Sequence, residues 1–146
     1  MEFTAPISRF MSRKMITVAP GDRMTLVKEI FEKNRIHHIP VVRHNSLVGI
    51  ISKQDYMHFL RGDNQSPYDE LVEQSRLHSY RVEDVMTTGI ATLESSERVN
   101  VALEVLAENL FHAIPIVDNG ELVGMFSTLD IIKTLQEEDL ARIKAN

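Results

Sequence analysis

Two Ser-x-x-Asp motifs hold the residues of this chain that are best suited to binding a ligand. Ser52 is followed three residues later by Asp55, and Ser127 is followed at the same spacing by Asp130. At the start of a helix such a serine places its hydroxyl beside free backbone N–H groups, which favours a phosphate because the helix dipole adds to the hydrogen bonds. The carboxylate in the first turn can accept both hydroxyls of a ribose. The motifs therefore indicate two sites for a ligand that carries a ribose and a phosphate.

The alternative interpretation of each motif is structural. A serine N-cap followed by an acidic third residue is a common way to begin a helix. For one motif alone we favour the cap, whereas two motifs that recur in register favour ligand binding. Lys53 lies inside the first motif, at a position where the second has Thr128.

Other chemistry finds little support in the residues. His37 and His38 are adjacent, and neighbouring side chains on a strand point to opposite faces, so the two cannot readily bind one metal ion. His44 and His58 have no zinc-like spacing to them. Serine, histidine and aspartate occur without a nucleophile elbow, a phosphate loop or a nucleophile–base–orienter set. We therefore expect no metal site, no catalytic residues and no enzymatic activity.

The motifs belong to an internal repeat. Residues 11–55 align without gaps to residues 86–130, and 14 of these 45 positions are identical. Two copies are too few for a solenoid, which needs about three units or more. We expect the copies to pack on each other about a pseudo-twofold axis, with two related clefts at their junction.

Each copy predicts a β-α-β-β-α unit, and the fold class is therefore α+β. Short β-prone runs at 16–18 and 91–93 lead to turn and N-cap signals at 20–22 and 95–96. Helices should follow, ending at Asn34 and Asn109 in the left-handed conformation. Their apolar positions recur at helical spacing: Met24, Val27, Ile30 and Phe31 in the first copy, and Val99, Ala102, Val105 and Leu106 in the second.

Two apolar runs in each copy predict a hairpin, and a second helix begins near each Ser-x-x-Asp motif. The hairpin signal is strong at 118–121, where Asn-Gly supplies positive φ, and weaker at 43–46. We expect a polar loop at 62–67, an extra helix at 68–80 and a solvated helical extension at the end. The predicted boundaries are 7–60 for the first copy, 61–81 for the linker, 82–135 for the second copy and 136–146 for the tail.

Each copy resembles a CBS domain, and the tandem resembles a Bateman module. The resemblance rests on a Met-Thr or Met-Ser step at 86–87 and 11–12, on His-x-Ile-Pro-x-Val at 37–42 and 112–117, and above all on Gly-x-x-Ser-x-x-Asp at 49–55 and 124–130. It covers nearly the whole chain apart from the ends and the linker. It implies a regulatory module that binds AMP, ADP, ATP, S-adenosylmethionine or related adenosine ligands, with no catalytic cofactor. Such modules usually control an attached enzyme or channel; here we expect a stand-alone pair that signals to a separate partner protein.

The resemblance also assigns ligand contacts. It gives the Ser-x-x-Asp residues the ribose and phosphate roles described above. The positions before and within the Ile-Pro step, together with the first β-prone runs, should line an adenine cleft. The candidates are His37, His38, Ile39, Pro40, His112, Ala113, Ile114 and Pro115, with Thr17, Val18, Thr92 and Leu93. For His37 and His112, a structural role where the chain enters the sheet is an equal alternative.

Composition narrows the class of protein. The chain has 146 residues, no cysteine and a net charge of −5. Acidity argues against a nucleic-acid binder, which is normally basic. The absence of cysteine excludes disulfides and thiolate chemistry. No apolar run reaches membrane-spanning length, and the N-terminus lacks a signal pattern, so we expect a cytoplasmic protein with no membrane partner.

Charge and apolar patterning add two expectations. Residues 11–60 hold eight Lys or Arg against four Asp or Glu, whereas residues 86–135 hold two against seven. A multiply phosphorylated ligand should therefore favour the site with Ser52 and Asp55. The second helix of each copy carries apolar residues that a single chain would leave exposed to water, and such patches usually mark an interface, so we expect a homodimer. These residues are Tyr56, Met57, Phe59, Leu60, Ile131, Ile132 and Leu135. The rival function is a structural or dimerisation module with degenerate pockets.

Overall fold

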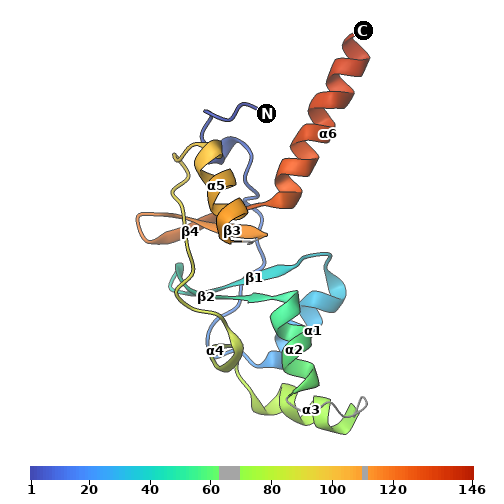
Figure 1. The fold of residues 1–146 in the computed structure, drawn as a ribbon. Coiled ribbons are helices and arrows are strands. Elements are labelled where there is room, and N and C mark those ends of the chain that lie inside the picture. The colour runs from blue at the N-terminus through green and yellow to red at the C-terminus, as the bar shows by residue number, and fades with distance from the viewer. Residues whose placement is uncertain (63–69, 110–111) are drawn as a thin grey trace. The chain divides into compact units, whose positions relative to one another are not determined.

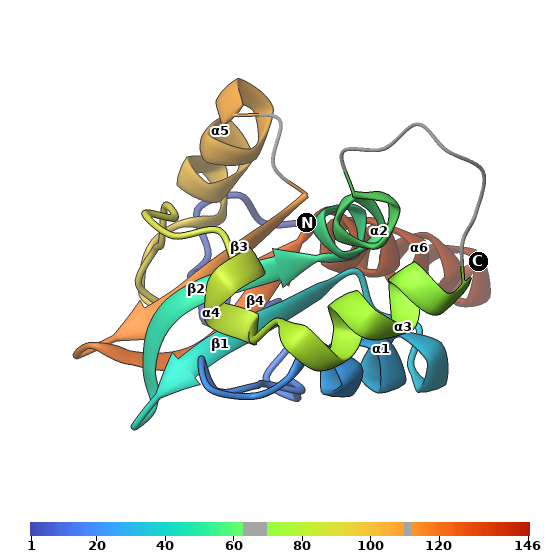
Figure 2. The same ribbon diagram turned by 90° about the horizontal axis from the view of Figure 1, so that it is seen from below.

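The computed structural model describes residues 1–62, 70–109 and 112–146 (Figures 1 and 2). The chain forms two compact units, of which one is Ile16–Ile90 and the other combines Met1–Met15 with Ala91–Asn146. We call them the middle unit and the terminal unit. Each contains a two-stranded antiparallel sheet and helices, so the α+β class predicted from the sequence is confirmed.

The middle unit packs its helices against one hairpin. It contains α1 (Met24–Lys33), β1 (His38–Arg43), β2 (Ser46–Ser52), α2 (Lys53–Arg61), α3 (Glu70–Ser79) and α4 (Val82–Val85). Figure 2 shows α1, α2 and α3 side by side at one end of the hairpin. The predicted helical stripe is correct, because Met24, Val27, Ile30 and Phe31 are all buried in the core of this unit.

The terminal unit repeats the arrangement. It contains a short 3-10 helix η1 (Ile7–Arg9), α5 (Val99–Asn109), β3 (Ala113–Asp118), β4 (Glu121–Ser127) and α6 (Thr128–Ala145). Val99, Ala102 and Leu106 are buried in its core, and Val105 is partly buried against it. The helical tail predicted from residue 136 is the continuation of α6 (Figure 1), and its side chains are exposed.

The first strand predicted in each copy is wrong as a strand. Residues 16–18 and 91–93 each make a single parallel bridge, Val18 to Val41 and Leu93 to Ile116. Val18 N–H donates to the Pro40 carbonyl at 3.1 Å and its carbonyl accepts from Val42 N–H at 2.9 Å. Leu93 N–H likewise donates to the Pro115 carbonyl at 3.3 Å, and its carbonyl accepts from Val117 N–H at 2.9 Å. β-propensity places these runs beside the sheet, but one bridge is too short to continue a ladder.

Both hairpins turn through two residues with positive φ. Asn119 and Gly120 have φ of 52° and 80°, and His44 and Asn45 have φ of 49° and 66°. The weaker turn signal of the first copy therefore produces the same kind of turn, because asparagine and histidine tolerate the left-handed region better than most residues.

The predicted helix ends need correction. Asn34 is extended (φ −132°, ψ 144°), and its side-chain amide donates to the Ile30 carbonyl at 2.9 Å, so it caps α1 with its side chain and not with a left-handed backbone. Asn109 is the last residue of α5. The N-cap of α1 is Arg23, without a side-chain bond, and Asp22 instead accepts from Ala19 N–H at 2.8 Å. The extra helix exists as α3, while residues 63–67 of the predicted polar loop lie outside the described residues.

A short segment at the start of each repeat packs on the hairpin of the other copy. Thr87 exchanges two backbone hydrogen bonds with Ile50, at 3.0 and 2.9 Å, and Ser12 exchanges two with Met125, at 2.8 and 2.9 Å. We call residues 86–87 and 11–12 the crossing segments. A Cβ on Gly49 would lie 2.6 Å from the Met86 Sδ, and one on Gly124 would lie 2.8 Å from the Met11 Sδ. Glycine is therefore required where the crossing segments pass.

The expectation that the whole apolar face of both second helices lacks cover is wrong for the first copy. Tyr56 and Phe59 are buried within the middle unit. Tyr56 lies 5.3 Å from Phe31, and Phe59 lies 5.4 Å from Tyr80, measured between ring centroids. Leu60 and Ile131 are partly buried against the cores of their own units. The apolar residues that stay exposed are Met57, Ile132 and Leu135.

Candidate functional site

In the middle unit, Ser52 and Asp55 form a capping box at the start of α2. Asp55 N–H donates to the Ser52 Oγ at 2.9 Å, and Ser52 N–H donates to the Asp55 Oδ2 at 3.2 Å. The Thr87 hydroxyl donates to the same Oδ2 at 3.4 Å, which is long for a hydroxyl donor. The structural interpretation of this motif is therefore satisfied. Asp55 is half-buried, and its Oδ1 accepts no hydrogen bond from the residues that the structure describes.

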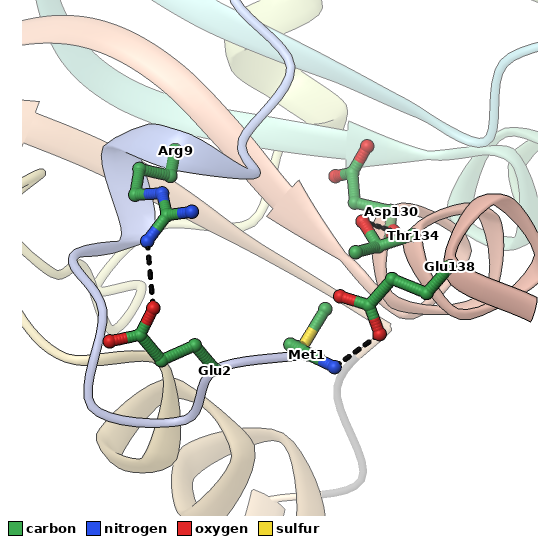
Figure 3. A network of polar contacts seen from close by, with 6 residues as sticks. All are labelled: Met1, Glu2, Arg9, Asp130, Thr134 and Glu138. Atoms are coloured by element: carbon green, nitrogen blue, oxygen red, sulfur yellow. Dashed lines mark hydrogen bonds and ion pairs between the residues drawn. The ribbon is translucent and has the colours of Figure 1, made fainter. Parts of the chain in front are cut away.

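The terminal unit builds the equivalent box at the start of α6. Asp130 Oδ2 accepts from Ser127 N–H at 2.8 Å and from the Ser127 hydroxyl at 3.0 Å, while Asp130 N–H donates to the Ser127 Oγ at 3.2 Å. The Ser12 hydroxyl donates to Asp130 Oδ1 at 2.8 Å. Figure 3 shows Asp130 directing its carboxylate away from the ion pair between the Met1 ammonium and Glu138. The Asp130 carbonyl accepts from the Thr134 hydroxyl at 2.8 Å.

The helix starts offer fewer free N–H groups than the motif suggests. Lys53 N–H donates to the His37 carbonyl at 2.8 Å, and Thr128 N–H donates to the His112 carbonyl at 3.0 Å. With Asp55 N–H and Asp130 N–H also paired, two of the first three donors of each helix are occupied. His37 and His112 thus hold the helix starts through their backbones, and their side chains are exposed.

The remaining candidates divide by exposure. The strand register pairs His38 with Ser52 and Ala113 with Ser127, which brings the start of each hairpin strand to the capping box. His38 and Leu93 are half-buried, and Thr17, Lys53 and Thr92 are exposed. The buried candidates are Val18, Ile39, Pro40, Ala113, Ile114 and Pro115.

Sequence reasoning missed the hydroxyls of Thr87 and Ser12 as neighbours of the two carboxylates. Each hydroxyl lies within 3.4 Å of an aspartate more than 30 positions away in the chain. The signal was present in the repeat, since the two residues occupy equivalent positions in the two copies. Their role becomes visible only when each crossing segment is placed on the hairpin of the other copy.

The division of the chain into units also reduces the predicted charge difference. Arg13 and Lys14 fall in the sequence window of the first copy but belong to the terminal unit. The middle unit holds nine Lys or Arg against ten Asp or Glu, a net charge of −1, and the terminal unit holds seven against eleven, a net charge of −4. The middle unit remains the less acidic of the two, but by far less than the sequence windows indicate.

One carboxylate outside the boxes has a shifted pKa. The Ser95 hydroxyl and N–H donate to Asp118 at 2.6 and 2.9 Å. These hydrogen bonds, the side-chain one first, lower the pKa of Asp118 because they stabilise the charged form. Among the residues that the structure describes, no cluster of three or more His, Asp or Glu could hold a metal ion. No helix in this described part is both long and apolar enough to cross a membrane.

A family model of the CBS domain matches the chain twice, at residues 7–62 and 82–137. The matches cover most of the 146 residues, and the chain belongs to the CBS domain family. Both capping boxes and both crossing segments lie inside the matched regions.

Similar sequences occur in longer proteins. MJ1225, an uncharacterized protein of Methanocaldococcus jannaschii, is 26% identical over 128 residues, which make up 87% of this chain and 46% of that protein. The inosine-5'-monophosphate dehydrogenase of Thermoplasma acidophilum is 27% identical over 131 residues, or 89% of this chain and 24% of the enzyme. The chain therefore spans about half the length of the first relative and about a quarter of the second.

Solved structures share the fold. A Vibrio cholerae protein named for acetoin utilization, AcuB, has a TM-score of 0.77 at 19% identity, with 98% of each chain covered. CBSX2, solved in complex with AMP, has a TM-score of 0.76 at 20% identity and covers 92% of this chain and 99% of its own. The CBS domain pair of MJ0100, solved with 5-methylthioadenosine and S-adenosyl-L-methionine, has a TM-score of 0.72 at 22% identity and covers 92% and 98%.

Proposed function

We propose that this CBS pair is a regulatory module that binds adenosine-containing ligands, such as AMP, ADP, ATP or S-adenosylmethionine, at its two Ser-x-x-Asp boxes. The observation that carries the proposal is the half-buried carboxylate of Asp55. Its Oδ1 accepts no hydrogen bond from the described residues, although a second hydroxyl-bearing segment passes beside it. An acceptor held rigidly by a helix start and still open on one oxygen suits the hydroxyls of a ribose.

The structures solved with ligands support the ligand class. CBSX2 was solved with AMP, and the MJ0100 pair with 5-methylthioadenosine and S-adenosyl-L-methionine. Adenosine is the part common to these three molecules, and their charged groups differ. The same fold, together with the two capping boxes of this chain, makes an adenosine compound the preferred ligand.

Each part of the ligand has a partner among the candidates. Asp55 and Asp130 accept the ribose hydroxyls, and the Ser52 hydroxyl and the Lys53 ammonium face the phosphate of the first site. The strand starts at His38 and Ala113, with Thr17 and Thr92 nearby, border the adenine. The buried residues of the Ile-Pro steps, Ile39, Pro40, Ile114 and Pro115, hold the strand starts in place through the core and do not contact the base.

Regulation requires that the ligand bind two conformations of the module unequally, because equal binding shifts no equilibrium. The two copies are the parts that we propose to move. The regulated protein is either an attached domain or a separate partner.

Calorimetry with AMP, ADP, ATP and S-adenosylmethionine, alongside GMP and GTP, tests the proposal. We expect an adenosine ligand to bind, and Asp55→Asn to weaken its tighter phase about 10–150-fold, because a charge-assisted hydrogen bond is lost. Asparagine keeps the shape and one acceptor oxygen for the Ser52 cap. The control is Glu29→Gln, which removes one negative charge from an exposed ion pair with Lys33 on α1 of the same unit. No binding of any nucleotide, or equal binding of GMP and AMP, contradicts the proposal and favours a structural module.

We further propose that the chain forms a homodimer through α6. The exposed apolar side chains of this helix are 47–61% exposed and lie within an arc of about 140° on a regular helix: Leu129, Ile132, Leu135, Leu140 and Ile143. An antiparallel second copy of α6, centred on Gln136, places Leu129 opposite Ile143 and Ile132 opposite Leu140. It also places Lys133 opposite Asp139, so a second copy of this chain is complementary in charge.

Light scattering of the full chain tests the dimer. The wild type should have about twice the 16.7 kDa mass of one chain, and Ile132→Glu should have the mass of one chain. The control is Met57→Glu on α2, because Met57 is the residue equivalent to Ile132 in the first copy and is 41% exposed. A wild type of single-chain mass at micromolar concentration, or a dimeric Ile132→Glu variant, contradicts this interface.

A further inference from the structure

The two site carboxylates differ in how many of their acceptor positions the protein itself uses. Asp130 accepts three hydrogen bonds, two on Oδ2 from Ser127 and one on Oδ1 from the Ser12 hydroxyl at 2.8 Å. Asp55 accepts two, both on Oδ2, and the one from Thr87 is long at 3.4 Å. Its Oδ1 accepts none from the described residues. Two boxes that look equivalent in the repeat are therefore unequal as acceptors.

The two units present these hydroxyls through the same pattern of backbone pairing, although the N-cap serines differ in φ, −82° at Ser52 and −127° at Ser127. Ser12 is held by paired backbone bonds to Met125 at 2.8 and 2.9 Å, and Thr87 by paired bonds to Ile50 at 2.9 and 3.0 Å. The repeat thus delivers a hydroxyl to the same place in each unit. Serine directs it to the outer oxygen of its aspartate at a normal distance, whereas threonine, with its added methyl group, makes a long contact to the oxygen that the helix cap already uses.

From this we infer that Ser12 is a specificity-determining residue of the site in the terminal unit, where its hydroxyl competes with the ribose of a ligand for Asp130. The inference rests on the proposed function and deepens it. A ribose that needs both carboxylate oxygens finds Oδ1 of Asp55 open, but must displace the Ser12 hydroxyl from Oδ1 of Asp130. The site with Asp55 is then the tighter one for a ligand with two ribose hydroxyls, independently of the charge of its phosphates.

The test isolates each site in the full chain and uses AMP as the probe. In an Asp55→Asn background, which weakens the first site, Ser12→Ala should tighten AMP binding at the second site about tenfold by calorimetry, equivalent to about 1.4 kcal/mol. The gain should be smaller for 2'-deoxy-AMP, which presents one hydroxyl fewer. The matched control is Thr87→Ala in an Asp130→Asn background, where the long contact predicts a change of less than about threefold.

The outcomes separate this inference from the proposed function. If the wild type binds no adenosine ligand, the proposed function fails. If the wild type binds AMP but Ser12→Ala leaves the Asp55→Asn variant with unchanged, weaker or no binding, the role of Ser12 is refuted and the proposed function stands. Ser12→Thr, which copies the residue of the other crossing segment, decides the question if circular dichroism shows that Ser12→Ala does not fold. It should also tighten binding, and unchanged affinity refutes the inference.

Discussion

Replacement of Gly49 by alanine should destabilise the middle unit, because this glycine lies directly under a crossing segment. The new Cβ would lie 2.6 Å from the Met86 Sδ, 2.9 Å from its Cγ and 3.0 Å from the Thr87 carbonyl oxygen. The methionine side chain can move, but the carbonyl cannot easily retreat, since it accepts the Ile50 N–H at 3.0 Å. The clash must therefore be relieved by shifting either the hairpin or the crossing segment.

The cost follows from two opposing terms. Overpacking of a well-packed site costs about 1–3 kcal/mol. Alanine also restricts the unfolded chain, which returns about 0.4–1 kcal/mol where the backbone tolerates it. We expect a net loss of roughly 1–2 kcal/mol in the free energy of unfolding, and each kcal/mol lowers Tm by about 2–4 °C for a chain of this size.

Thermal and urea denaturation of the full chain measure the effect, with Gly21→Ala as the control. No atom lies within 4 Å of a Cβ built on Gly21, so that variant should be neutral or slightly stabilised. In the double variant with Met86→Ala, the two side-chain clashes disappear, and the loss due to Gly49→Ala should shrink by about 1 kcal/mol. If Gly49→Ala is as mild as Gly21→Ala, or if Met86→Ala does not reduce its cost, the close approach does not constrain this position.

Two further predictions concern contacts that join distant elements. Arg76→Ala should lower the free energy of unfolding by about 1–3 kcal/mol, measured by urea denaturation. The Arg76 Nε donates to the Phe59 carbonyl at 3.1 Å, and its guanidinium stacks on the rings of Phe59 and Tyr80. If Arg76→Lys keeps the stability of the wild type, the planar guanidinium is not needed. Asp118→Asn should lower Tm at pH 7. The hydrogen bonds from Ser95 lower the pKa of Asp118 in the folded state, so the charged carboxylate stabilises the fold fully above the ordinary pKa of about 3.9. This stabilisation is lost as the pH falls further, and the difference in Tm between wild type and Asp118→Asn should therefore shrink below about pH 4. A constant difference in Tm down to about pH 2 would contradict the prediction.

Local features of the fold were predictable because their causes are local. The capping boxes at Ser52 and Ser127 need only two residues three positions apart, and the Asn119-Gly120 turn needs only residues that tolerate positive φ. Helical periodicity correctly placed Val27 and Val99 in the cores. A local prediction failed where the same residue can end a helix in two ways. Asn34 was expected to end α1 with a left-handed backbone, but it caps the helix with its side-chain amide instead.

The sequence by itself determined that the chain is a doubled CBS unit and that each copy carries a Ser-x-x-Asp box, since spacing and repetition are properties of the chain alone. Only the tertiary structure decided which hydroxyl meets which carboxylate. Residues 11–12 begin the first repeat yet pack on the hairpin of the second, and residues 86–87 begin the second repeat yet pack on the hairpin of the first. Such pairings depend on contacts between residues far apart in the chain, which no periodicity records. For the same reason the burial of Tyr56 and Phe59, the exposure of Ile132 and the unequal demands on Asp55 and Asp130 became visible only in the folded chain.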